Sequence, residues 1–452
     1  MTDPLVLSAF LDDRPEAGVF RVHSSIFSDA AVFDAEMRYL FEGGWVFLGL
    51  ECQVPAAHDF LTTTIGRKPV VVMRDGEGVL RAFHNRCPHR GAQLCTLGAG
   101  SARVHVCPYH SWSFDSEGRN RAIKGKSEGG YTEAFLAGSH DLAPIAAFGS
   151  YRGLMFGSVA ADVPPLEDYL GEARVVLDLL LDQSPDGIEA LPGTVSYLYR
   201  GNWKLQLENC SDAYHVTSVH PTYLRIAGDR AQAAAGAVQE RGQHVAELFS
   251  REAPAGTFTL DNGHALTWAS TPVAPGHALF HRSAELEARF GAARRDWMFY
   301  TRNLTLFPNA QFADNFSSQL RVIRPLAPDL TEMTTWCLGP KGEPPAARRQ
   351  RLREYEDFFN PTGMATPDDN SVYEDCQAAA GGVPDADGWL LGYSRGIGIA
   401  ADGGNSAADE IGLAPRRASL GTIQLGDETI FHSYYRAWRS RLAAGLAREA
   451  AR

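Results

Sequence analysis

The sequence predicts an α+β protein, in which a small antiparallel β domain precedes a larger domain whose antiparallel sheet is covered by helices. The stretch from Trp45 to about Asp162 is rich in strand patterns, and a helical pattern follows over Leu166 to Leu181. Beyond it, strands and helices mix without the βαβ rhythm of a parallel sheet. We therefore expect three parts: an N-terminal helical segment packing on the larger domain (1–44), the β domain (45–162) and the larger domain (163–452).

The N-terminal segment contains a helix signal from Ser28 to Phe41. Ser28 or Asp29 suits the N-cap, and Gly43-Gly44 ends the pattern. Between them runs an apolar stripe at helical spacing, made of Phe33, Met37, Leu40 and Phe41.

A hairpin pattern opens the β domain. Val70 to Met73 and Val79 to Phe83 flank Asp75-Gly76, and the second strand leads towards Cys87. In the larger domain, we expect sheet strands at Asn303 to Leu306, Gln319 to Ile323 and Glu332 to Leu338. A packing helix should end the chain, with Phe431, Tyr434, Trp438, Leu442 and Leu446 on one stripe.

Composition and charge exclude several partners. The 452 residues carry a net charge of −12, which argues against nucleic acid and anionic membranes. The chain shows neither an apolar run of about 18 residues nor a basic-apolar secretory leader. Seven cysteines are an odd number, so we expect a reducing cytoplasm.

Two Cys/His pairs carry most of the chemistry. They read C-x-H-x17-C-x2-H, with Cys87, His89, Cys107 and His110 as the four ligands. Two thiolates on one iron and two imidazoles on the other make the ligand set of a Rieske [2Fe-2S] cluster. Such a cluster carries electrons, so a terminal acceptor should follow along the chain.

Zinc is the competing interpretation, because two cysteines and two histidines also make a tetrahedral site. Zinc sites usually place like ligands together, whereas here each short motif supplies one of each type. Pro88 and Pro108 stiffen the turn after each cysteine, and Gly91 frees the backbone beside the metal. These features favour the cluster.

The acceptor motif lies about a hundred residues further on. Glu208, Asp212 and His215 are spaced i, i+4, i+7 and would share one helix face. His220 leaves that stripe, so the helix must end or distort, as Pro221 favours. Two histidines and a carboxylate form the facial triad of non-haem Fe(II) oxygenases. Local spacing would choose Asp212 as the carboxylate but does not settle the choice.

Together the two motifs resemble the α subunit of Rieske ring-hydroxylating dioxygenases, over nearly the whole chain. The resemblance implies that Asp212 is not a ligand. It would hydrogen-bond the ligand His215 and bridge to His110 of the neighbouring subunit, with Tyr109 beside it. Asn209 matches a family residue close to the iron.

The resemblance also places the iron carboxylate in Gly363 to Asn370. Neighbouring helical side chains diverge by about 100°, so one of Asp368 and Asp369 faces the metal, and Asp369 aligns with the family ligand.

The benzoate, anthranilate and 2-halobenzoate branch is the most similar. Gly201-Asn-Trp-Lys-Leu205 and Gly263-His-Ala-Leu-Thr-Trp268 are among the stretches that place the chain there. Two departures stand out. Ser111 occupies a position where glycine is usual, and Pro221-Thr-Tyr replaces the usual run after the histidine motif, close to the expected active site.

The resemblance implies a terminal oxygenase that inserts both atoms of O2 into an aromatic carboxylate, such as benzoate, anthranilate or a 2-substituted benzoate, to give a cis-diol. One [2Fe-2S] cluster and one mononuclear Fe(II) would serve it, with electrons from NADH through a reductase or ferredoxin. Electron transfer between subunits implies an α3 ring or, with small β subunits, α3β3.

Several alternatives use the same residues. A Rieske monooxygenase or demethylase needs both metals, and a dioxygenase could take salicylate or an aromatic sulfonate. A pure electron-transfer Rieske protein would not need His215, His220 and Asp369, and a zinc-stabilised binding module would be colourless.

Cationic side chains suggest two further roles. Five residues are candidates for binding a substrate carboxylate: Arg225, Arg230, His264, Arg282 and Arg302. The group Arg348, Arg349, Arg351 and Arg353 could dock an acidic partner, but we favour a solvated helix face.

Overall fold

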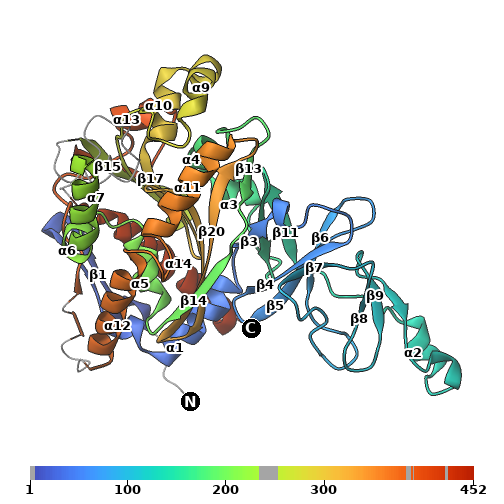
Figure 1. The fold of residues 1–452 in the computed structure, drawn as a ribbon. Helices are drawn as coiled ribbons and strands as arrows, with labels where there is room; N and C mark the ends of the chain where they lie inside the picture. The colour runs from blue at the N-terminus through green and yellow to red at the C-terminus, as the bar shows by residue number, and fades with distance from the viewer. Residues whose placement is uncertain (1–5, 234–252, 383–387, 390, 423–425, 452) are drawn as a thin grey trace. The chain divides into compact units, whose positions relative to one another are not determined.

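The computed structural model describes most of the chain, in two compact units (Figure 1). One unit contains Met1–Glu36 and Glu167–Arg452, and the other contains Met37–Leu166. The described residues are 6–233, 253–382, 388–389, 391–422 and 426–451. Within them, no helix is both long and apolar enough to cross a membrane.

The smaller unit consists of three antiparallel sheets. Their strand orders are β6-β5-β4-β7, β10-β9-β8 and β11-β12-β3. The strands are β3 Val46–Leu50, β4 Asp59–Ile65, β5 Lys68–Arg74, β6 Leu80–His84, β7 Ala99–Ser101, β8 Val104–Val106, β9 Ser113–Asp115, β10 Asn120–Ala122, β11 Ala147–Tyr151 and β12 Leu154–Ser158. One helix, α2, spans Glu133–Ala137.

The β5/β6 hairpin confirms the predicted turn at Asp75. Met73 pairs with Arg81, and the Asp75 carboxylate accepts from the N–H groups of Glu77 and Val79. The carboxylate takes the place of backbone partners in the turn, which is why aspartate suits this position. β6 then runs directly into the loop that carries Cys87.

The larger unit is built on a ten-stranded antiparallel sheet, as the absence of a βαβ rhythm predicted. Its order is β13-β20-β19-β18-β17-β16-β15-β23-β22, with β14 also pairing β20. The strands are β13 Ile188–Ala190, β14 Val195–Tyr199, β15 Pro254–Thr259, β16 Ala265–Ala269, β17 Thr301–Leu306, β18 Ala310–Asp314, β19 Ser318–Ala327, β20 Leu330–Pro340, β22 Ala401–Asp402 and β23 Arg417–Thr422. A small second sheet joins β1 Leu11–Arg14, β2 Val19–Val22 and β21 Leu391–Gly392.

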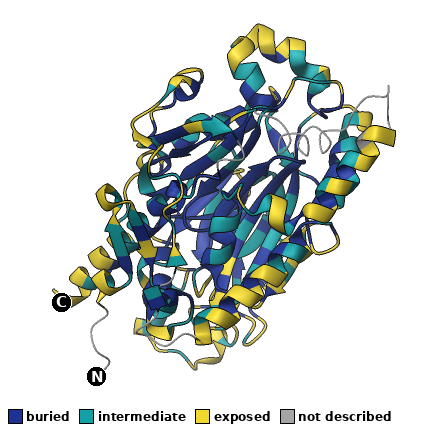
Figure 2. Cartoon of the chain, turned by 90° about the vertical axis from the view of Figure 1, so that its left-hand side faces the viewer, coloured by how far each residue is buried: buried dark blue, intermediate teal, exposed yellow. Residues whose placement is uncertain are grey.

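Helices cover the ten-stranded sheet and leave its strands largely buried (Figure 2). α5, α11 and α12 contact the β14, β19 and β20 region, whereas α4 and α14 contact β15 to β17. The helices are α1 Ala30–Ala35, α3 Leu166–Leu170, α4 Ala173–Leu181, α5 Trp203–Asn209, α6 Val216–Val219, α7 Pro221–Ala233, α9 Ser283–Phe290, α10 Ala292–Phe299, α11 Pro345–Phe358, α12 Thr366–Gly382, α13 Ser406–Asp409 and α14 Thr429–Ala450. The predicted C-terminal packing helix is confirmed by α14.

The N-terminal helix differs from its prediction in its second half. Asp29 caps α1 as expected, but the turn from Glu36 to Phe41 is a π-helix. Glu36 is fully buried, and its carboxylate accepts hydrogen bonds from Lys204, Trp203 and Trp438. A buried carboxylate must be paired, and these partners come from distant helices. The local pattern therefore carried no sign of this contact.

Candidate functional site

The two cluster loops of the smaller unit share one backbone turn. In each loop the cysteine carbonyl accepts from the N–H four residues on at 3.0 Å, and the cysteine N–H donates to the carbonyl five residues on at 2.8 Å. The loops follow β6 and β8 and begin at Cys87 and Cys107. The spacing that suggested two ligand motifs thus corresponds to two copies of one turn.

The fourth residue after each cysteine has a left-handed backbone. Gly91 has φ 76° and Ser111 has φ 59°. Only glycine adopts this conformation without a steric cost from Cβ. Ser111, noted above as a departure from the usual glycine, therefore carries backbone strain that Gly91 does not.

The four predicted cluster residues lie together at the loop tips. Cys87 and Cys107 are both 2% exposed, and burial, together with the neighbouring Cys107 thiol, raises the pKa of Cys87. The rings of His89 and His110 are 4.5 Å apart, and His89 stacks on Trp112 at 4.7 Å with an interplanar angle of 6°.

This donor set fits a [2Fe-2S] cluster. The Nδ1 atom of His89 is buried and has no hydrogen-bond partner among the described residues, which is costly unless a ligand takes it up. Burial lowers the pKa of His110, as do the charges of His89, Arg90 and Lys124, and a neutral imidazole is the form that binds metal. Two thiols beside two imidazoles are the chemistry that a Rieske cluster requires.

Two residues near this site, Cys95 and Tyr109, are not part of the ligand set. Cys95 is a buried thiol whose Sγ lies 3.3 Å from His105 Nδ1, and burial raises the pKa of Cys95 to about 12. Tyr109, predicted beside His110, is 53% exposed, with its ring 3.8 Å from that of His110.

In the larger unit, the acceptor motif is not one continuous helix. The prediction that Glu208, Asp212 and His215 share a helix face is wrong, because α5 ends at Asn209. His215 precedes the four-residue helix α6, and His220 follows it with φ −111° and ψ 37°, outside the α region. Pro221 then starts α7, as expected from the restriction that proline places on the preceding residue.

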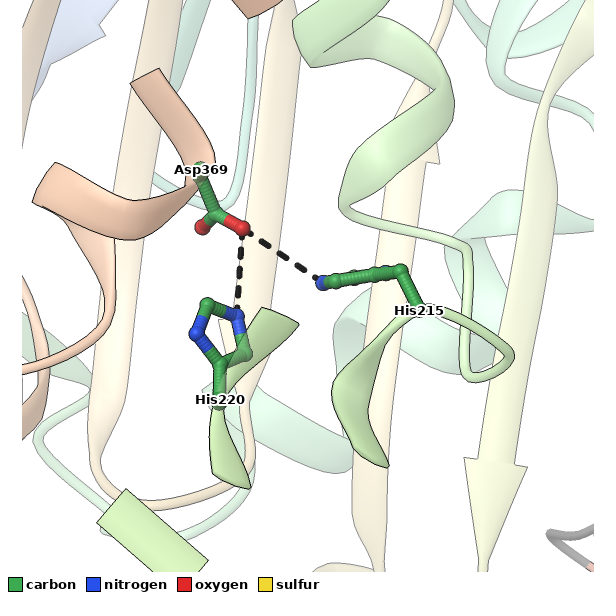
Figure 3. Close-up of side chains that lie close together, drawn as sticks. All are labelled: His215, His220 and Asp369. Atoms are coloured by element: carbon green, nitrogen blue, oxygen red, sulfur yellow. Dashed lines mark ion pairs between the residues drawn. The ribbon is translucent and has the colours of Figure 1, made fainter. Parts of the chain in front are cut away.

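This break turns both imidazoles towards one carboxylate (Figure 3). Asp369 Oδ1 lies 3.1 Å from His220 Nε2 and 3.5 Å from His215 Nε2. Ligands about 2.1 Å from one metal in adjacent positions are about 3 Å apart, so the spacing fits a shared ion. All three ligand atoms lie within 4.8 Å of one another, and the triad therefore fits a mononuclear iron.

Asp369 enters the site from the first turn of α12. His220 and Asp369 are 2% and 8% exposed. Burial acts to raise the pKa of Asp369, but the hydrogen bond and charge of His220, and then the charges of His215 and Arg321, hold it below its usual value. Asp368 lies on the other side of His220: its side chain is 44% exposed, and its Oδ2 is 3.5 Å from Nδ1, the nitrogen that faces away from Asp369.

Asp212 and Asn209 surround the first histidine. Asp212 Oδ2 accepts from His215 Nδ1 at 3.1 Å, which leaves Nε2 as the lone-pair nitrogen facing Asp369. Burial acts to lower the pKa of His215, but the hydrogen bond and charge of Asp212 outweigh it and raise that pKa. The Asn209 amide is 3.1 Å from both His215 Nε2 and Asp369 Oδ1.

Glu208 faces away from this group. The hydroxyls of Tyr393 and Tyr435 donate to its carboxylate. Burial raises the pKa of Glu208 to about 8 in spite of these hydrogen bonds.

The structure assigns protein partners to most cationic candidates. Arg230 pairs with Asp357, Arg282 with Glu285 and Arg302 with the buried Asp314. His264 bridges the Tyr169 carbonyl and the Phe307 N–H, and Arg225 is exposed. The prediction of a solvated arginine face on α11 is wrong for Arg351, which is buried against Glu343.

One residue beside the triad went unnoticed in the sequence. Arg321, on β19, is 8% exposed, and its charge reaches Asp369 and His215. The available signal was a cation in the middle of the predicted strand Gln319 to Ile323.

Two family profiles match this chain. A Rieske [2Fe-2S] domain profile matches residues 44–136, and the profile of the ring hydroxylating alpha subunit catalytic domain matches residues 166–444. The chain belongs to the ring-hydroxylating dioxygenase α subunits. This family uses a Rieske cluster and a mononuclear iron, with O2 as co-substrate and NADH as the electron source through a reductase.

Curated relatives agree over nearly the full chain. Toluate 1,2-dioxygenase subunit alpha of Pseudomonas putida is 40% identical, covering 98% of this chain and 95% of the relative. The 2-halobenzoate 1,2-dioxygenase large subunit of Burkholderia cepacia is 39% identical, covering 98% and 94%. The anthranilate 1,2-dioxygenase large subunit of Acinetobacter baylyi is 37% identical, covering 97% and 93%.

Solved structures support the same architecture. Naphthalene 1,2-dioxygenase with indole bound in its active site has a TM-score of 0.78 and 25% identity, with 94% of each chain covered. The α+β fold of this α subunit, with its antiparallel sheets, is thus shared with a ring-hydroxylating oxygenase.

Proposed function

We propose that this α subunit, in a terminal oxygenase, converts an aromatic carboxylate such as benzoate, anthranilate or a 2-substituted benzoate to a cis-diol. The observation that carries the proposal is the convergence of His215, His220 and Asp369 in a chain that also holds the two cluster loops. The names of the curated relatives, which act on toluate, 2-halobenzoate and anthranilate, support the substrate class.

In this proposal His215, His220 and Asp369 hold Fe(II), while the cluster is held by Cys87, His89, Cys107 and His110. When bound, the cluster supplies single electrons and the Fe(II) supplies the centre that activates O2.

The remaining site residues position these ligands. Asp212 keeps a proton on Nδ1 of His215, so that Nε2 is presented to the metal. Asn209 orients the Asp369 carboxylate through its amide. Loss of either contact would disturb ligand orientation without removing a ligand.

We further propose an α3 or α3β3 assembly with small β subunits, in which Asp212 meets His110 of the neighbouring subunit. Exposed aromatic side chains beside both residues support this contact, since such residues are enriched at protein interfaces. Tyr109 is 53% exposed and Tyr214 is 51% exposed.

We propose that the protein works in the reducing environment of the cytoplasm. The described residues include all seven cysteines, and these are free thiols.

The test is reconstitution of the anaerobically purified oxygenase with Fe(II) and a surrogate reductase. Benzoate, anthranilate, 2-halobenzoates, salicylate and sulfonated analogues are then screened for product formed with O2 consumption. We expect a cis-diol from at least one carboxylate. A phenol or an aldehyde as the product would indicate a monooxygenase or demethylase, and turnover of sulfonates alone would change the substrate class.

A further inference from the structure

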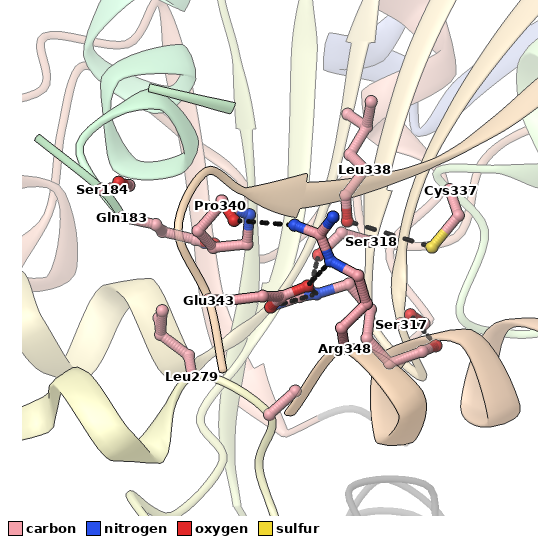
Figure 4. Close-up of polar contacts among 12 residues, drawn as sticks. Gln183, Ser184, Leu279, Ser317, Ser318, Cys337, Leu338, Pro340, Glu343 and Arg348 are labelled. Carbon is pink, nitrogen blue, oxygen red and sulfur yellow. Dashed lines mark hydrogen bonds and ion pairs between the residues drawn. The ribbon is translucent and has the colours of Figure 1, made fainter. Parts of the chain in front are cut away.

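Three buried arginines of the larger unit differ in their partners. Arg351 pairs with Glu343. Glu343 also binds Arg348, and Figure 4 shows these two side chains together. Arg302 pairs with Asp314. Arg321 is 8% exposed, yet across the described part of the chain no carboxylate forms an ion pair or hydrogen bond with it. Buried charges are normally paired, so Arg321 lacks the partner that the other two have.

The contacts of Arg321 leave its terminal nitrogens available. Its Nε donates to Gln319 Oε1, and its guanidinium carbon lies 5.3 Å from the ring centre of Phe359. These contacts orient the side chain, but neither neutralises its charge. The planar fork of a guanidinium binds a carboxylate through two parallel hydrogen bonds.

Sheet register places Arg321 on the face that carries the triad. Arg321 is directly opposite Gln311 on β18 and Thr335 on β20, and such cross-strand neighbours point to the same face. The Gln311 amide donates to the Leu207 carbonyl of α5, the helix that leads to Asn209. Arg321 therefore lies on the side of the sheet that α5 covers.

Aromatic rings connect Arg321 to the metal-binding histidine. Phe359 lies under the guanidinium. The ring centres of Phe359 and Phe358 are 5.0 Å apart, and those of Phe358 and His220 are 6.0 Å apart. Phe358 also stacks on Phe316 at 3.7 Å. The three rings belong to one buried apolar cluster, which borders the Arg321 cation through Phe359 and His220 through Phe358. Aromatic packing between a cation and a metal-binding histidine suits the ring of an aromatic acid.

A second unpartnered group lies on the same helix as Asp369. The Tyr373 hydroxyl is buried and has no hydrogen-bond partner among the described residues, and Tyr373 is 5% exposed. Tyr373 follows Asp369 by one turn of α12, and its ring is 5.1 Å from that of Tyr199 on β14. Tyr199 lies opposite Thr331 on β20, on the sheet face that Arg321 shares through its own β20 neighbour Thr335. Burial raises the pKa of the Tyr373 phenol, and the charges of Asp369 and Arg321 also act on that pKa.

We propose that Arg321 binds the substrate carboxylate through its two terminal nitrogens and that the Tyr373 hydroxyl donates a further hydrogen bond. This inference rests on the proposed function and identifies the residues that select an acid over a neutral ring. It replaces the five cationic candidates of the sequence, most of which have protein partners. The bound carboxylate supplies the missing counter-charge of Arg321 and satisfies the buried phenol.

The test uses the full holo-oxygenase and compares benzoate with its neutral analogue benzamide. For Arg321→Gln we expect the Kd of benzoate, from titration calorimetry, and its KM to rise about 100-fold, with less than about a threefold change for benzamide. For Arg321→Lys the Kd of benzoate should rise about tenfold, because the point charge of lysine replaces the planar fork of the guanidinium. Arg324→Gln, on the exposed side of β19, is the matched control and should leave both Kd values unchanged.

Tyr373→Phe tests the second donor without loss of charge. It removes a hydroxyl that has no hydrogen-bond partner in the described part of the chain, so the melting temperature should not fall, while the Kd of benzoate should rise about five- to tenfold. An unchanged Kd would show that the Tyr373 hydroxyl does not bind the carboxylate. If Arg321→Gln does not fold, as judged by melting and cluster absorbance, Tyr373→Phe together with Arg321→Lys decides the question.

The outcomes separate this inference from the proposed function. If the wild-type enzyme oxidises benzoate, and Arg321→Gln still prefers benzoate over benzamide as strongly as the wild type does, the inference is wrong. The proposed function is then unaffected. A wild-type enzyme that oxidises only neutral aromatics overturns the proposed substrate class as well. Tighter binding of benzenesulfonate than of benzoate would overturn the assignment to a carboxylate.

Discussion

The two metal sites of this chain are built in different ways. The cluster loops each follow a short strand and close with the same pair of backbone hydrogen bonds, so each ligand pair is local. The triad joins histidines around α6 to an aspartate on α12, and the Asn209 to Asp369 contact spans 160 residues. The first site therefore depends on turn geometry, whereas the second depends on how α12 packs beside α5.

The sites also differ in what holds their histidines. In the cluster loops, His89 is held by stacking on Trp112. In the triad, carboxylates surround the imidazoles, because Asp212 binds His215 and Asp368 lies 3.5 Å from His220. Carboxylate partners raise the basicity of a ligating imidazole, which suits a site that must retain a single ion.

Removal of the triad carboxylate should have the largest effect. We expect Asp369→Ala to lose the mononuclear iron. Turnover should therefore fall by more than the about 10- to 100-fold that is typical when a residue that only hydrogen-bonds a metal ligand is removed. Iron content and the cluster absorption of the purified protein measure this, since the cluster should remain. Asp375→Ala, at an exposed position further along α12, is the control and should keep its iron.

Removal of the histidine partner should have a smaller effect on metal and a separate effect on electron delivery. In Asp212→Ala, iron affinity should fall about 10- to 100-fold, and product formation should stop with the cluster still reducible. Single-turnover experiments on iron-loaded protein separate the two. If Asp212→Ala lost the iron while Asp369→Ala kept it, the roles of the two carboxylates would be reversed.

Glu208 predicts a pH dependence that is specific to the larger unit. Its pKa is raised to about 8 in the folded protein, so between about pH 4.5 and 8 the folded state holds a proton that the unfolded state has lost. The contribution of Glu208 to stability should therefore fall as pH rises, by at most about 1.4 kcal/mol per pH unit. Urea unfolding of Glu208→Gln should show a flatter pH profile, and an unchanged slope would contradict the prediction.

The smallest effect should separate the two cluster loops. Ser111→Gly removes the strain of a positive φ at the cost of a more flexible unfolded chain, so we expect a gain of about 0.5 to 1 kcal/mol. Gly91→Ser should lose a similar amount or more. The temperature at which the cluster absorbance is lost measures the stability of both variants. It should rise for Ser111→Gly and fall for Gly91→Ser.

The sequence predicted best where the partners are close in the chain. The β5/β6 hairpin, the Asp29 cap and the helix α14 were all predicted correctly, because each depends on neighbours within a turn or a strand. Two of the errors arose where a distant partner decides the structure. Glu36 lies in a π-helix beside Lys204, and Arg351 is buried against Glu343.

The sequence alone determined the donor types of both sites, the local turns that present the cluster ligands, and the family, since these depend on residue identity and short spacing. Tertiary structure decided which carboxylate meets His215 and His220, and it placed Arg321 on the sheet face that α5 covers, with Tyr373 on the helix that carries Asp369. The reason is physical: short spacing constrains neighbours along one helix or strand. Contacts between α5, α12 and β19 form only when the sheet and its helices pack together.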